Sequence, residues 1–421
     1  MRVCLVGGGA REHALADTLS RTAEVVCTPG NPGIADVAEC VTRPAEDIDA
    51  DLYVIGPEAP LVDGLADRLR ARNRSVFGPG ADGARLEGSK AWMKEVLVDA
   101  GVPTARHRAF GASEGEDAVA LLRSMSGPWV VKTDGLAAGK GVLVTSDLDE
   151  AIDDVRAKLS GATFGAAGEV VVVEEFLAGA EVSILALCDG QRAVALPAAQ
   201  DFKRLADGDQ GPNTGGMGAC SPVPGVDEAV IAEVLERAVT PTLAALSARG
   251  IDYRGVLYAG IMLTPDGLRV LEYNVRFGDP EAQVVLPRVD DDLAAWLAAA
   301  AAGALPPGAP ATSPDACVTV VMAAAGYPTS PRSGDPVSGV AEAQLLPGVR
   351  VYQAGTAEAG GVLRTAGGRV LAVTGRGRDL AAARRNAFAG IDRITFPGAQ
   401  YRRDIAAEAA RMQLSTSPTS Q

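Results

Sequence analysis

Short apolar runs alternate with helical patterns along the first hundred residues. Residues 2–6 form a continuous apolar run that ends in three glycines, and a helical pattern opens at Ala10. Further strands are predicted at 23–27 and 51–55, and each leads into a loop rich in glycine and proline. Strand, glycine turn and helix in this order predict a doubly wound α/β unit, in which ligands bind at the carboxyl ends of the parallel strands.

The pattern changes after Pro103 and becomes typical of antiparallel sheets. The expected elements are strands at 128–132, 142–145, 169–177, 182–188, 255–263 and 268–272, and helices at 147–159 and 227–248. The strand at 182–188 is expected to close a small unit with the strands before it. Residues 200–220 are rich in Gly, Asp and Lys and read as a long polar loop without regular structure. Such a loop is usually functional or disordered, and its glycines favour close backbone approach to a ligand.

The last hundred residues predict a separate small α+β domain. It follows a linker at 303–315 rich in Pro, Ala and Gly, and its expected elements are strands at 316–323, 349–353 and 368–374 and a helix at 379–393. The predicted division is a Rossmann-like α/β domain at 1–103, a central domain at 104–312, the α+β domain at 313–410 and a disordered tail at 411–421.

Composition narrows the class of protein. The 421 residues are 47% hydrophobic and 22% charged, as in ordinary globular proteins, and the net charge of −14 argues against nucleic acid or an anionic membrane as a partner. Six scattered cysteines without a Cys-x-x-Cys pair favour a reducing compartment, and two histidines make structural zinc improbable. The apolar helix at 293–305 is too short to span a bilayer. We expect a cytoplasmic protein, with a monomer favoured.

The first glycine turn matches the dinucleotide-binding fingerprint only in part. Gly7 and Gly9 fit it, but Glu12 stands at the position of the third glycine. A carboxylate at that helix start would repel a pyrophosphate. The turn therefore favours a structural role over NAD binding. An NAD-dependent oxidoreductase remains an alternative, although it leaves residues 86–283 unexplained.

A glycine-rich loop follows the predicted strand that ends at Lys132. The segment 135–141 superficially resembles a Walker A loop, but it has three residues between its glycines rather than four, and Gly141 replaces the Ser or Thr that would hold Mg²⁺. It is better explained as a hairpin loop that folds over a triphosphate with its backbone N–H groups and Lys140. The alternative is that Lys132 is an ordinary solvent-facing lysine.

Two of the predicted strands near this glycine-rich loop end in residues with carboxylate side chains. Glu174 and Glu175 end one of them, where the chain could meet an adenine edge, and Glu181 could contact ribose hydroxyls. They could equally cap a solvated strand edge. Glu272 and Asn274 lie two residues apart at the end of the other strand, so their side chains point to the same side. Two such oxygen ligands suit Mg²⁺ bound to phosphates.

Arg276 follows this metal motif directly. A guanidinium next to a metal–phosphate site is the arrangement needed to activate a carboxylate with ATP. The alternative is a structural salt bridge between Arg276 and Asp279 beside the Gly-Asp-Pro turn. From the residues alone, the site is predicted to perform ATP-driven ligation of a carboxylate and an amine.

Six motifs carry a resemblance to a known family. They are Gly7-Gly-Gly-Ala-Arg-Glu-His-Ala14, Gly56-Pro-Glu-Ala-Pro-Leu61, Leu86-Glu-Gly-Ser-Lys90, Lys132-Thr-Asp-Gly-Leu-Ala-Ala-Gly-Lys-Gly141, Gly211-Pro-Asn-Thr-Gly-Gly-Met-Gly218 and Arg276-Phe-Gly-Asp-Pro-Glu281. The chain resembles the phosphoribosylamine–glycine ligases, or glycinamide ribonucleotide synthetases, from residue 1 to about Ile405. The run from Arg276 to Gln283 is specific to these ligases, whereas the lysine and Glu-x-Asn pattern is shared across the ATP-grasp superfamily.

The resemblance implies a function and a fold. The implied reaction joins glycine to 5-phosphoribosylamine with ATP through glycyl phosphate, with Mg²⁺ or Mn²⁺, in purine biosynthesis. The implied architecture is a pre-ATP-grasp domain, an ATP-grasp domain with a mobile lid at about 115–188, and a small C-terminal domain. The family often has His where this chain has Phe202, which puts a histidine role in that loop in doubt.

Residue chemistry and resemblance together assign the site. The expected ATP-binding residues are Lys90, Lys132, Gly135, Gly139, Lys140, Gly141, Glu174, Glu175, Leu177 and Glu181. The expected substrate-binding residues are Gly9, Arg11, Glu12, Pro57, Glu58, Asp201, Lys203, Asn213, Arg276 and Gly278. Catalytic roles are expected for Arg276, Lys132 and Asp279, and metal binding for Glu272 and Asn274. Two alternatives remain: a non-catalytic nucleotide-binding regulator, and a related ligase acting on another carboxylate.

Overall fold

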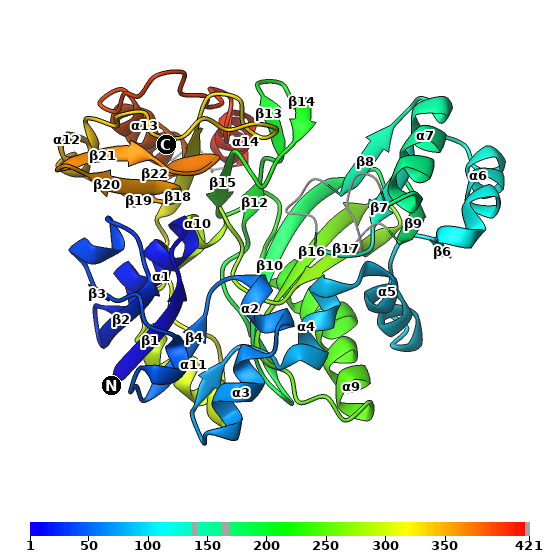
Figure 1. Cartoon of the computed structure of the whole chain (residues 1–421), viewed down its shortest axis with the longest axis horizontal. Helices are drawn as coiled ribbons and strands as arrows, with labels where there is room; N and C mark the ends of the chain where they lie inside the picture. The colour runs from blue at the N-terminus through cyan, green and yellow to red at the C-terminus, as the bar shows by residue number, and fades with distance from the viewer. Residues whose placement is uncertain (137–140, 162–168, 417–421) are drawn as a thin grey trace.

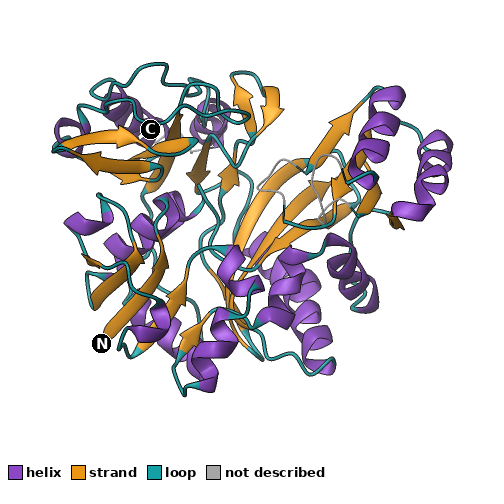
Figure 2. Cartoon of the chain, in the orientation of Figure 1, coloured by secondary structure: helices purple, strands orange, loops and turns teal. Residues whose placement is uncertain are grey.

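The computed structural model describes residues 1–136, 141–161 and 169–416. Four main sheets organise the chain (Figures 1 and 2). In the view of Figure 1, the N-terminal sheet lies below the C-terminal sheet on the left, and the sheets that carry β10 and β16 and then β7 and β9 follow to the right. Among the described residues, none of the helices combines the length and the apolar character needed to cross a bilayer.

The N-terminal region is the predicted α/β unit. Its five strands pair in parallel in the order β3-β2-β1-β4-β5. The strands are β1 (Arg2–Gly7), β2 (Glu24–Pro29), β3 (Glu39–Cys40), β4 (Leu52–Ile55) and β5 (Val76–Phe77). The helices are α1 (Ala10–Leu19), α2 (Glu58–Val62), α3 (Leu65–Ala71), α4 (Ala81–Gly88) and α5 (Lys90–Asp99). Ser89 caps α5 by accepting from the Trp92 N–H.

A small antiparallel sheet follows, with the order β6-β9-β7-β8. Its strands are β6 (His107–Gly111), β7 (Trp129–Thr133), β8 (Val142–Thr145) and β9 (Val170–Glu175), and its helices are α6 (Gly115–Ser124) and α7 (Leu148–Leu159). Apolar side chains from the sheet and both helices form a core of their own. The predicted hairpin is present, because β7 pairs with β8 in antiparallel register.

A second antiparallel sheet, in the order β11-β10-β16-β17, faces the small one. Its strands are β10 (Ala180–Asp189), β11 (Ala193–Ala195), β16 (Arg254–Thr264) and β17 (Gly267–Asn274), and its neighbouring helices are α8 (Glu228–Val234), a π-helical turn at Leu235–Val239 and α9 (Thr240–Ala248). The expectation that the strand at 182–188 closes the small unit is wrong. β10 pairs along its whole length with β16 instead, because its apolar side chains belong to the larger core.

The C-terminal sheet has the order β12-β15-β18-β22-β19. Its strands are β12 (Gln200–Asp201), β15 (Gly218–Ser221), β18 (Ala316–Ala323), β19 (Val349–Gln353) and β22 (Arg369–Gly377). Smaller elements are the hairpins β13 (Arg204–Ala206)–β14 (Gln210–Asn213) and β20 (Thr356–Ala359)–β21 (Val362–Thr365), and the helices α10 (Ala282–Val285), α11 (Leu293–Ala302), α12 (Val340–Gln344), α13 (Leu380–Ile391) and α14 (Ala407–Thr416).

Two expectations change here. The polar loop at 200–220 is not structureless: it contributes β12 and β15 to the C-terminal sheet and forms the β13–β14 hairpin between them. β15 pairs with β18, which lies about a hundred residues further along the chain, and the local composition of the loop does not indicate this pairing. The tail predicted to lack structure from 411 is helical as far as Thr416, where α14 ends.

Candidate active site

Two connected cavities lie where the sheets meet. The first, of about 930 Å³, is lined by residues of β7, β8, β9, β10 and β17 and by the segment 200–214. The second, of about 470 Å³, is bounded by the N-terminal helices, the end of β17 and the turn at 278–281, with the C-terminal region on one side. Asp201, Lys203 and Glu272 line both cavities, so the two cavities adjoin at these side chains.

A buried ion cluster forms the floor of the first cavity. The Glu174 carboxylate accepts from Lys132 at 3.0 Å and from Lys94 at 3.2 Å, and all three side chains are almost fully buried. Burial opposes the charge on Glu174, but the two lysines outweigh it and hold its pKa below the ordinary value. Lys132 also donates to the carbonyl of Leu271 at 3.2 Å. Lys132 is therefore a fixed cation that lines the cavity and not a solvent-facing lysine.

The end of β9 forms the wall beside this cluster. Glu175 accepts from the backbone N–H of Arg106 at 2.9 Å and from its guanidinium at 2.6 Å, so its carboxylate is engaged at the protein surface. Glu174 keeps one oxygen, Oε1, that is buried and has no hydrogen-bond partner among the described residues. Leu177 lines the same wall. A buried acceptor without a donor is uncommon in a folded protein.

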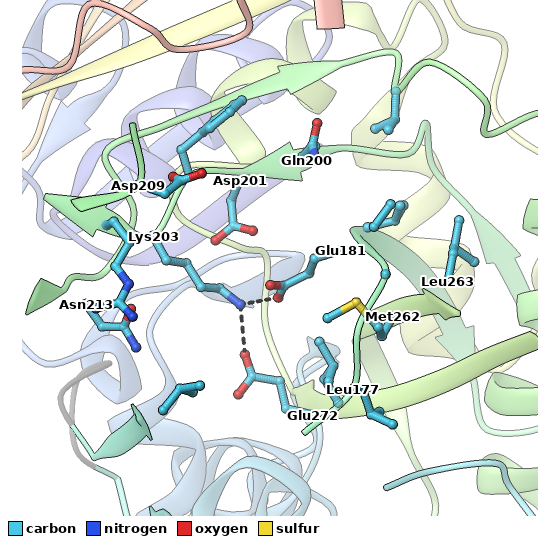
Figure 3. Close-up of a pocket in the computed structure, with 18 of the residues that line it drawn as sticks. Leu177, Glu181, Gln200, Asp201, Lys203, Asp209, Asn213, Met262, Leu263 and Glu272 are labelled. Carbon is cyan, nitrogen blue, oxygen red and sulfur yellow. Dashed lines mark hydrogen bonds and ion pairs between the residues drawn. The ribbon is translucent and has the colours of Figure 1, made fainter. Parts of the chain in front are cut away.

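Lys203 lines both cavities, and its side chain points towards Glu181 and Glu272 (Figure 3). Its ammonium forms an ion pair with Glu181 and lies 3.8 Å from the carboxylate of Glu272. Burial opposes the charge on Glu272, but Lys203, Lys132 and Lys90 together hold its pKa below the ordinary value. Glu272 is thus an ionised carboxylate surrounded by cations.

Glu272 and Asn274 fit a hard divalent cation. Both side chains line the second cavity from the end of β17, two residues apart on one side of the strand. Carboxylate and amide oxygens are ligands that such ions prefer, and two protein groups are enough when phosphate oxygens and water complete the shell. Within 1–136, 141–161 and 169–416 there is no cluster of three or more His, Cys, Asp or Glu side chains that would hold a metal alone.

Arg276 is fixed by carboxylates from the N-terminal region. Its guanidinium donates to Glu87 at 2.7 Å and to Glu58 at 3.2 Å, and lies 3.3 Å from the Asn274 amide oxygen. Burial works against its charge, but Glu87 and Glu58 raise its pKa above the ordinary value. The alternative salt bridge between Arg276 and Asp279 does not form. Both residues line the second cavity, but in separate ion pairs.

Asp279 is instead bound to the C-terminal region. One of its carboxylate oxygens accepts from Arg369 at 2.9 Å and the other from Gln283 at 2.6 Å. Arg369 also donates to the backbone carbonyl of Asp279 at 2.7 Å. The Gly-Asp-Pro turn is therefore held in place by an arginine from β22, a residue that the sequence did not indicate.

The first glycine turn is filled by a side chain of the protein itself. The carboxylate of Glu12 accepts from the Gly9 N–H at 2.6 Å and from Arg11 at 2.6 Å. A Cβ atom on Gly56 would lie 2.2 Å from the same carboxylate, so Glu12 packs directly against both turns. This arrangement opposes NAD binding, because the carboxylate occupies the turn where a pyrophosphate would approach the helix N-terminus.

Most of the predicted site residues border the cavities, but several do not. The first cavity is lined by Lys132, Glu174, Glu175, Leu177, Glu181, Asp201, Lys203, Asn213 and Glu272. The second is lined by Arg11, Glu58, Lys90, Gly141, Asp201, Lys203, Glu272, Asn274, Arg276 and Asp279. The residues that line neither are Gly9, Glu12, Pro57, Gly135 and Gly278. Gly139 and Lys140 lie outside the described residues.

Residues that the sequence analysis missed complete the site. They are Lys94, which supports Glu174, and Glu87, Tyr258, Glu281, Tyr327 and Arg369, which line the second cavity. Glu87 lies within the motif Leu86–Lys90, which was a usable signal, whereas Arg369 lies in no such motif. Phe202, at the position of the family's frequent histidine, packs partly buried against the C-terminal core.

The arrangement suits phosphoryl transfer followed by attack of a nucleophile. Cations line the first cavity, which is large enough for a nucleotide. Glu272 at the junction and Asn274 in the second cavity are oxygen ligands of the kind that a divalent ion prefers. A buried arginine lies on the far side of that junction. Phosphoryl transfer depends mainly on such positioning and charge neutralisation.

Comparison with known proteins agrees with this geometry. The chain matches the N domain of phosphoribosylglycinamide synthetase over residues 1–87, the ATP-grasp (A) domain over 88–282 and the C domain over 317–408. It is 49% identical to a phosphoribosylamine–glycine ligase of Streptomyces coelicolor, covering 97% of this chain and 100% of the relative.

Comparison with solved structures agrees with the sequence comparison. A crystal structure of phosphoribosylamine–glycine ligase from Thermotoga maritima is 35% identical and superposes with a TM-score of 0.85, covering 96% of this chain and 100% of that one. A biotin carboxylase from Campylobacter jejuni, at 14% identity and a TM-score of 0.71, covering 98% of this chain and 94% of that one, shares the fold alone. The three domain matches and the full-length relative place this chain in the phosphoribosylglycinamide synthetase family.

Proposed function

We propose that the protein ligates glycine to 5-phosphoribosylamine at the expense of ATP, giving glycinamide ribonucleotide, ADP and phosphate. The observation that carries the proposal is the junction at Glu272 and Lys203, where a cavity of nucleotide size opens onto a second cavity that contains Arg276. A γ-phosphate that extends from the first cavity would meet its acceptor in the second.

The first cavity is assigned to ATP. Glu174 and Glu175, at the end of β9, are the proposed residues beside the adenine edge, and Glu181, which lines the same cavity, is the proposed acceptor from the ribose hydroxyls. Lys132 and Lys90 would bind the phosphates. Burial lowers the pKa of Lys90 while Glu272 opposes this effect, so a polyanion that places negative charge beside Lys90 would favour its charged form.

The first step requires the carboxylate of glycine to face the γ-phosphate. Arg276 orients that carboxylate, since its guanidinium is held by Glu87 and Glu58 and cannot turn away. A carboxylate oxygen then attacks the γ-phosphorus and ADP leaves, which gives glycyl phosphate. Glu272 and Asn274 would hold a divalent ion, which neutralises charge on the β- and γ-phosphates when bound. Mg²⁺ is our expectation, with Mn²⁺ as the alternative.

The second step forms the amide. The amine of phosphoribosylamine attacks the glycyl carbonyl, and inorganic phosphate leaves with one oxygen that came from glycine. Arg11 and Glu58 line the N-terminal side of the second cavity and are the proposed contacts of the phosphoribosyl group. Water must be excluded while the acyl phosphate exists, which gives the predicted lid its purpose.

The main test is a phosphate-release assay with ATP, freshly generated phosphoribosylamine and a panel of amino acids. We expect turnover with glycine, and loss of this turnover in Glu272→Ala. Unchanged turnover and Mg²⁺ dependence in the variant would rule out Glu272 as a metal ligand. The control is Glu342→Ala, which removes an exposed carboxylate on α12 and should behave as wild type. Substantial turnover with another carboxylate but none with glycine would overturn the assignment and favour a related ligase.

The glycyl phosphate intermediate has its own test. Glycine labelled with oxygen-18 in its carboxylate should transfer one labelled oxygen to the released phosphate. Unlabelled phosphate would show that ATP is cleaved by water rather than by the carboxylate.

We further propose that the protein acts as a monomer in the cytoplasm, with a mobile lid near 115–188. Six free cysteines support a reducing compartment. Sedimentation of the full chain would test the monomer. The division at 103, 312 and 410 also remains a prediction, which limited proteolysis would test.

A further inference from the structure

Arg402 is an arginine of the C-terminal region that lies buried beside the first cavity. Only 1% of its surface is exposed. Its guanidinium donates to both carboxylate oxygens of Asp404, at 2.8 and 2.7 Å, and to Asp209 at 2.7 Å. Bidentate pairing fixes the plane of a guanidinium as well as its position. The position and the orientation of the Arg402 guanidinium are therefore fixed.

The Arg402 side chain contacts both residues that neighbour Lys203 in the chain. The guanidinium of Arg402 lies over the ring of Phe202, 5.4 Å from its centroid, where a cation is attracted to the aromatic face. Its NH1 group donates to the backbone carbonyl of Arg204 at 3.2 Å. The residues before and after Lys203 are thus anchored to the same side chain.

Further contacts join the β13–β14 hairpin, which begins at Arg204, to the segment that contains Arg402. The carboxylate of Asp207 accepts from the Arg403 N–H at 2.6 Å, and the Gly208 N–H donates to Asp404 at 2.8 Å. α14, which begins shortly after Asp404, contributes Glu408, Ala409 and Met412 to the lining of the first cavity. The C-terminal region therefore forms part of the wall of this cavity.

Lys203 needs such an anchor. Its ammonium must lie between Glu181 and Glu272, and the four-carbon stem of a lysine allows many other rotamers (Figure 3). The carbonyl of Lys203 is held from the other side by Thr214, whose N–H and hydroxyl both donate to it at 2.8 Å. Arg402 and Thr214 together set the direction in which the Lys203 side chain leaves the backbone.

We propose that Arg402 is a positioning residue for Lys203. Acting through Phe202 and the carbonyl of Arg204, it holds the ammonium at the junction of the two cavities. A residue of the C-terminal region thereby controls nucleotide binding in the central domain. The inference rests on the proposed function in one respect, that the first cavity, which Lys203 lines, takes the nucleotide.

The test compares Arg402→Lys with Arg376→Lys in the full chain. Arg376 is the control, because it too makes several hydrogen bonds in the C-terminal region, to Asp315, Ser313 and the carbonyl of Pro287, and lines neither cavity. In Arg402→Lys we expect the KM for ATP to rise about tenfold, as for a lost positioning contact, while the KM for glycine stays within about twofold. The control should change neither, whatever its effect on the melting temperature.

A double-mutant cycle separates positioning from general stability. If Arg402 acts through Lys203, then Arg402→Lys should have no further effect on the KM for ATP in a Lys203→Met background. Independent, multiplying effects would overturn the proposal. So would an equal rise of the KM for ATP in Arg376→Lys.

Milder variants keep the test informative if Arg402→Lys fails to fold. Phe202→Leu removes the aromatic face and should weaken ATP binding in the same direction, while Phe202→Tyr should retain it. Calorimetric titration with Mg·ADP supplies a readout that needs no turnover. If the wild type binds Mg·ADP but does not ligate glycine, the proposed function fails, while the affinities of Phe202→Leu and Phe202→Tyr for Mg·ADP still decide the positioning role. Equal Mg·ADP affinity in Phe202→Leu and wild type would contradict the positioning role of Arg402.

Discussion

The guanidinium of Arg276 pairs with Glu87, which lies 189 residues earlier in the chain, at 2.7 Å. Asp279, its near neighbour in sequence, pairs with Arg369 instead. The specific Arg-Phe-Gly-Asp-Pro-Glu run is therefore divided between two anchors, one in the N-terminal region and one in the C-terminal region. Arg276 and Asp279 both line the second cavity, and the two anchors fix their positions relative to each other.

We predict that Arg276→Ala impairs the use of glycine far more than the binding of nucleotide. Loss of a preorganised cation at the reacting centre typically costs 10²–10³-fold, so kcat/KM for glycine should fall by about that factor. The affinity for Mg·ADP should stay within about threefold, because Arg276 does not line the first cavity. Arg376→Ala is the control. Equal losses for glycine and nucleotide would contradict this assignment.

We predict that Glu87→Gln lowers kcat/KM for glycine by about tenfold or more. The amide can still accept from the Val275 N–H, as Glu87 does at 2.8 Å, but it loses the charged partner of Arg276. A hydrogen bond to a charged group contributes about 1.5–3 kcal/mol, which corresponds to this range. Steady-state kinetics with glycine as the varied substrate is the measurement. Unchanged kinetics would mean that Glu58 alone positions Arg276.

We predict that His13 makes stability depend on pH. Its Nδ1 accepts from the Gln353 N–H at 2.9 Å, which requires the neutral ring, and burial together with Arg350 lowers its pKa to about 4. The unfolded chain, with a pKa near 6.5, binds the proton first. The stabilisation is therefore complete above about pH 6.5 and is lost as pH falls towards about 4, by about 3 kcal/mol in total.

The matched variant is His13→Asn, whose Oδ1 can replace the Nδ1 acceptor but does not titrate. Urea unfolding near pH 7.5 and near pH 5 should show a smaller drop for this variant than for wild type, by about 2 kcal/mol. Parallel pH profiles for the two proteins would rule out His13 as the source.

We predict that Gly56→Ala destabilises the N-terminal domain by about 1–3 kcal/mol, the usual cost of overpacking. Its Cβ would lie 2.2 Å from Glu12, whose carboxylate is already bound to Gly9 and Arg11. Gly115→Ala at the start of α6 is the control, because its nearest neighbour would be Leu159 at 3.7 Å, and alanine favours a helix. Thermal melts of both variants check this, and equal destabilisation would be the contrary result.

Local pattern was sufficient for many elements. The apolar run at 2–6 predicted β1, and the pattern around the glycine-rich loop predicted the β7–β8 hairpin, because both depend on residues close in the chain. The partner of β10 could not be predicted in this way. Its sequence is compatible with either sheet, and only the shared core with β16 decides between them.

The predicted site residues show the same limit. Period-2 geometry was enough to place Glu272 and Asn274 on one side of a strand. It could not show that Glu12 turns away from both cavities to fill the glycine turn, or that Asp279 is occupied by Arg369. Ion pairs between distant segments depend on how whole domains pack against one another. A short sequence motif contains no information about that packing.

Taken by itself, the sequence predicted the class of chemistry from a Glu-x-Asn pattern expected to bind a metal ion, lysines expected to bind phosphate, and Arg276. This was possible because local geometry places residues that are close in the chain together. The tertiary structure alone decided which carboxylate holds Arg276, which region holds the Asp279 turn, and that Arg402 stands behind Lys203. These pairings join residues far apart in the chain, and burial makes each one specific, since a charge without its partner in the interior is strongly destabilising.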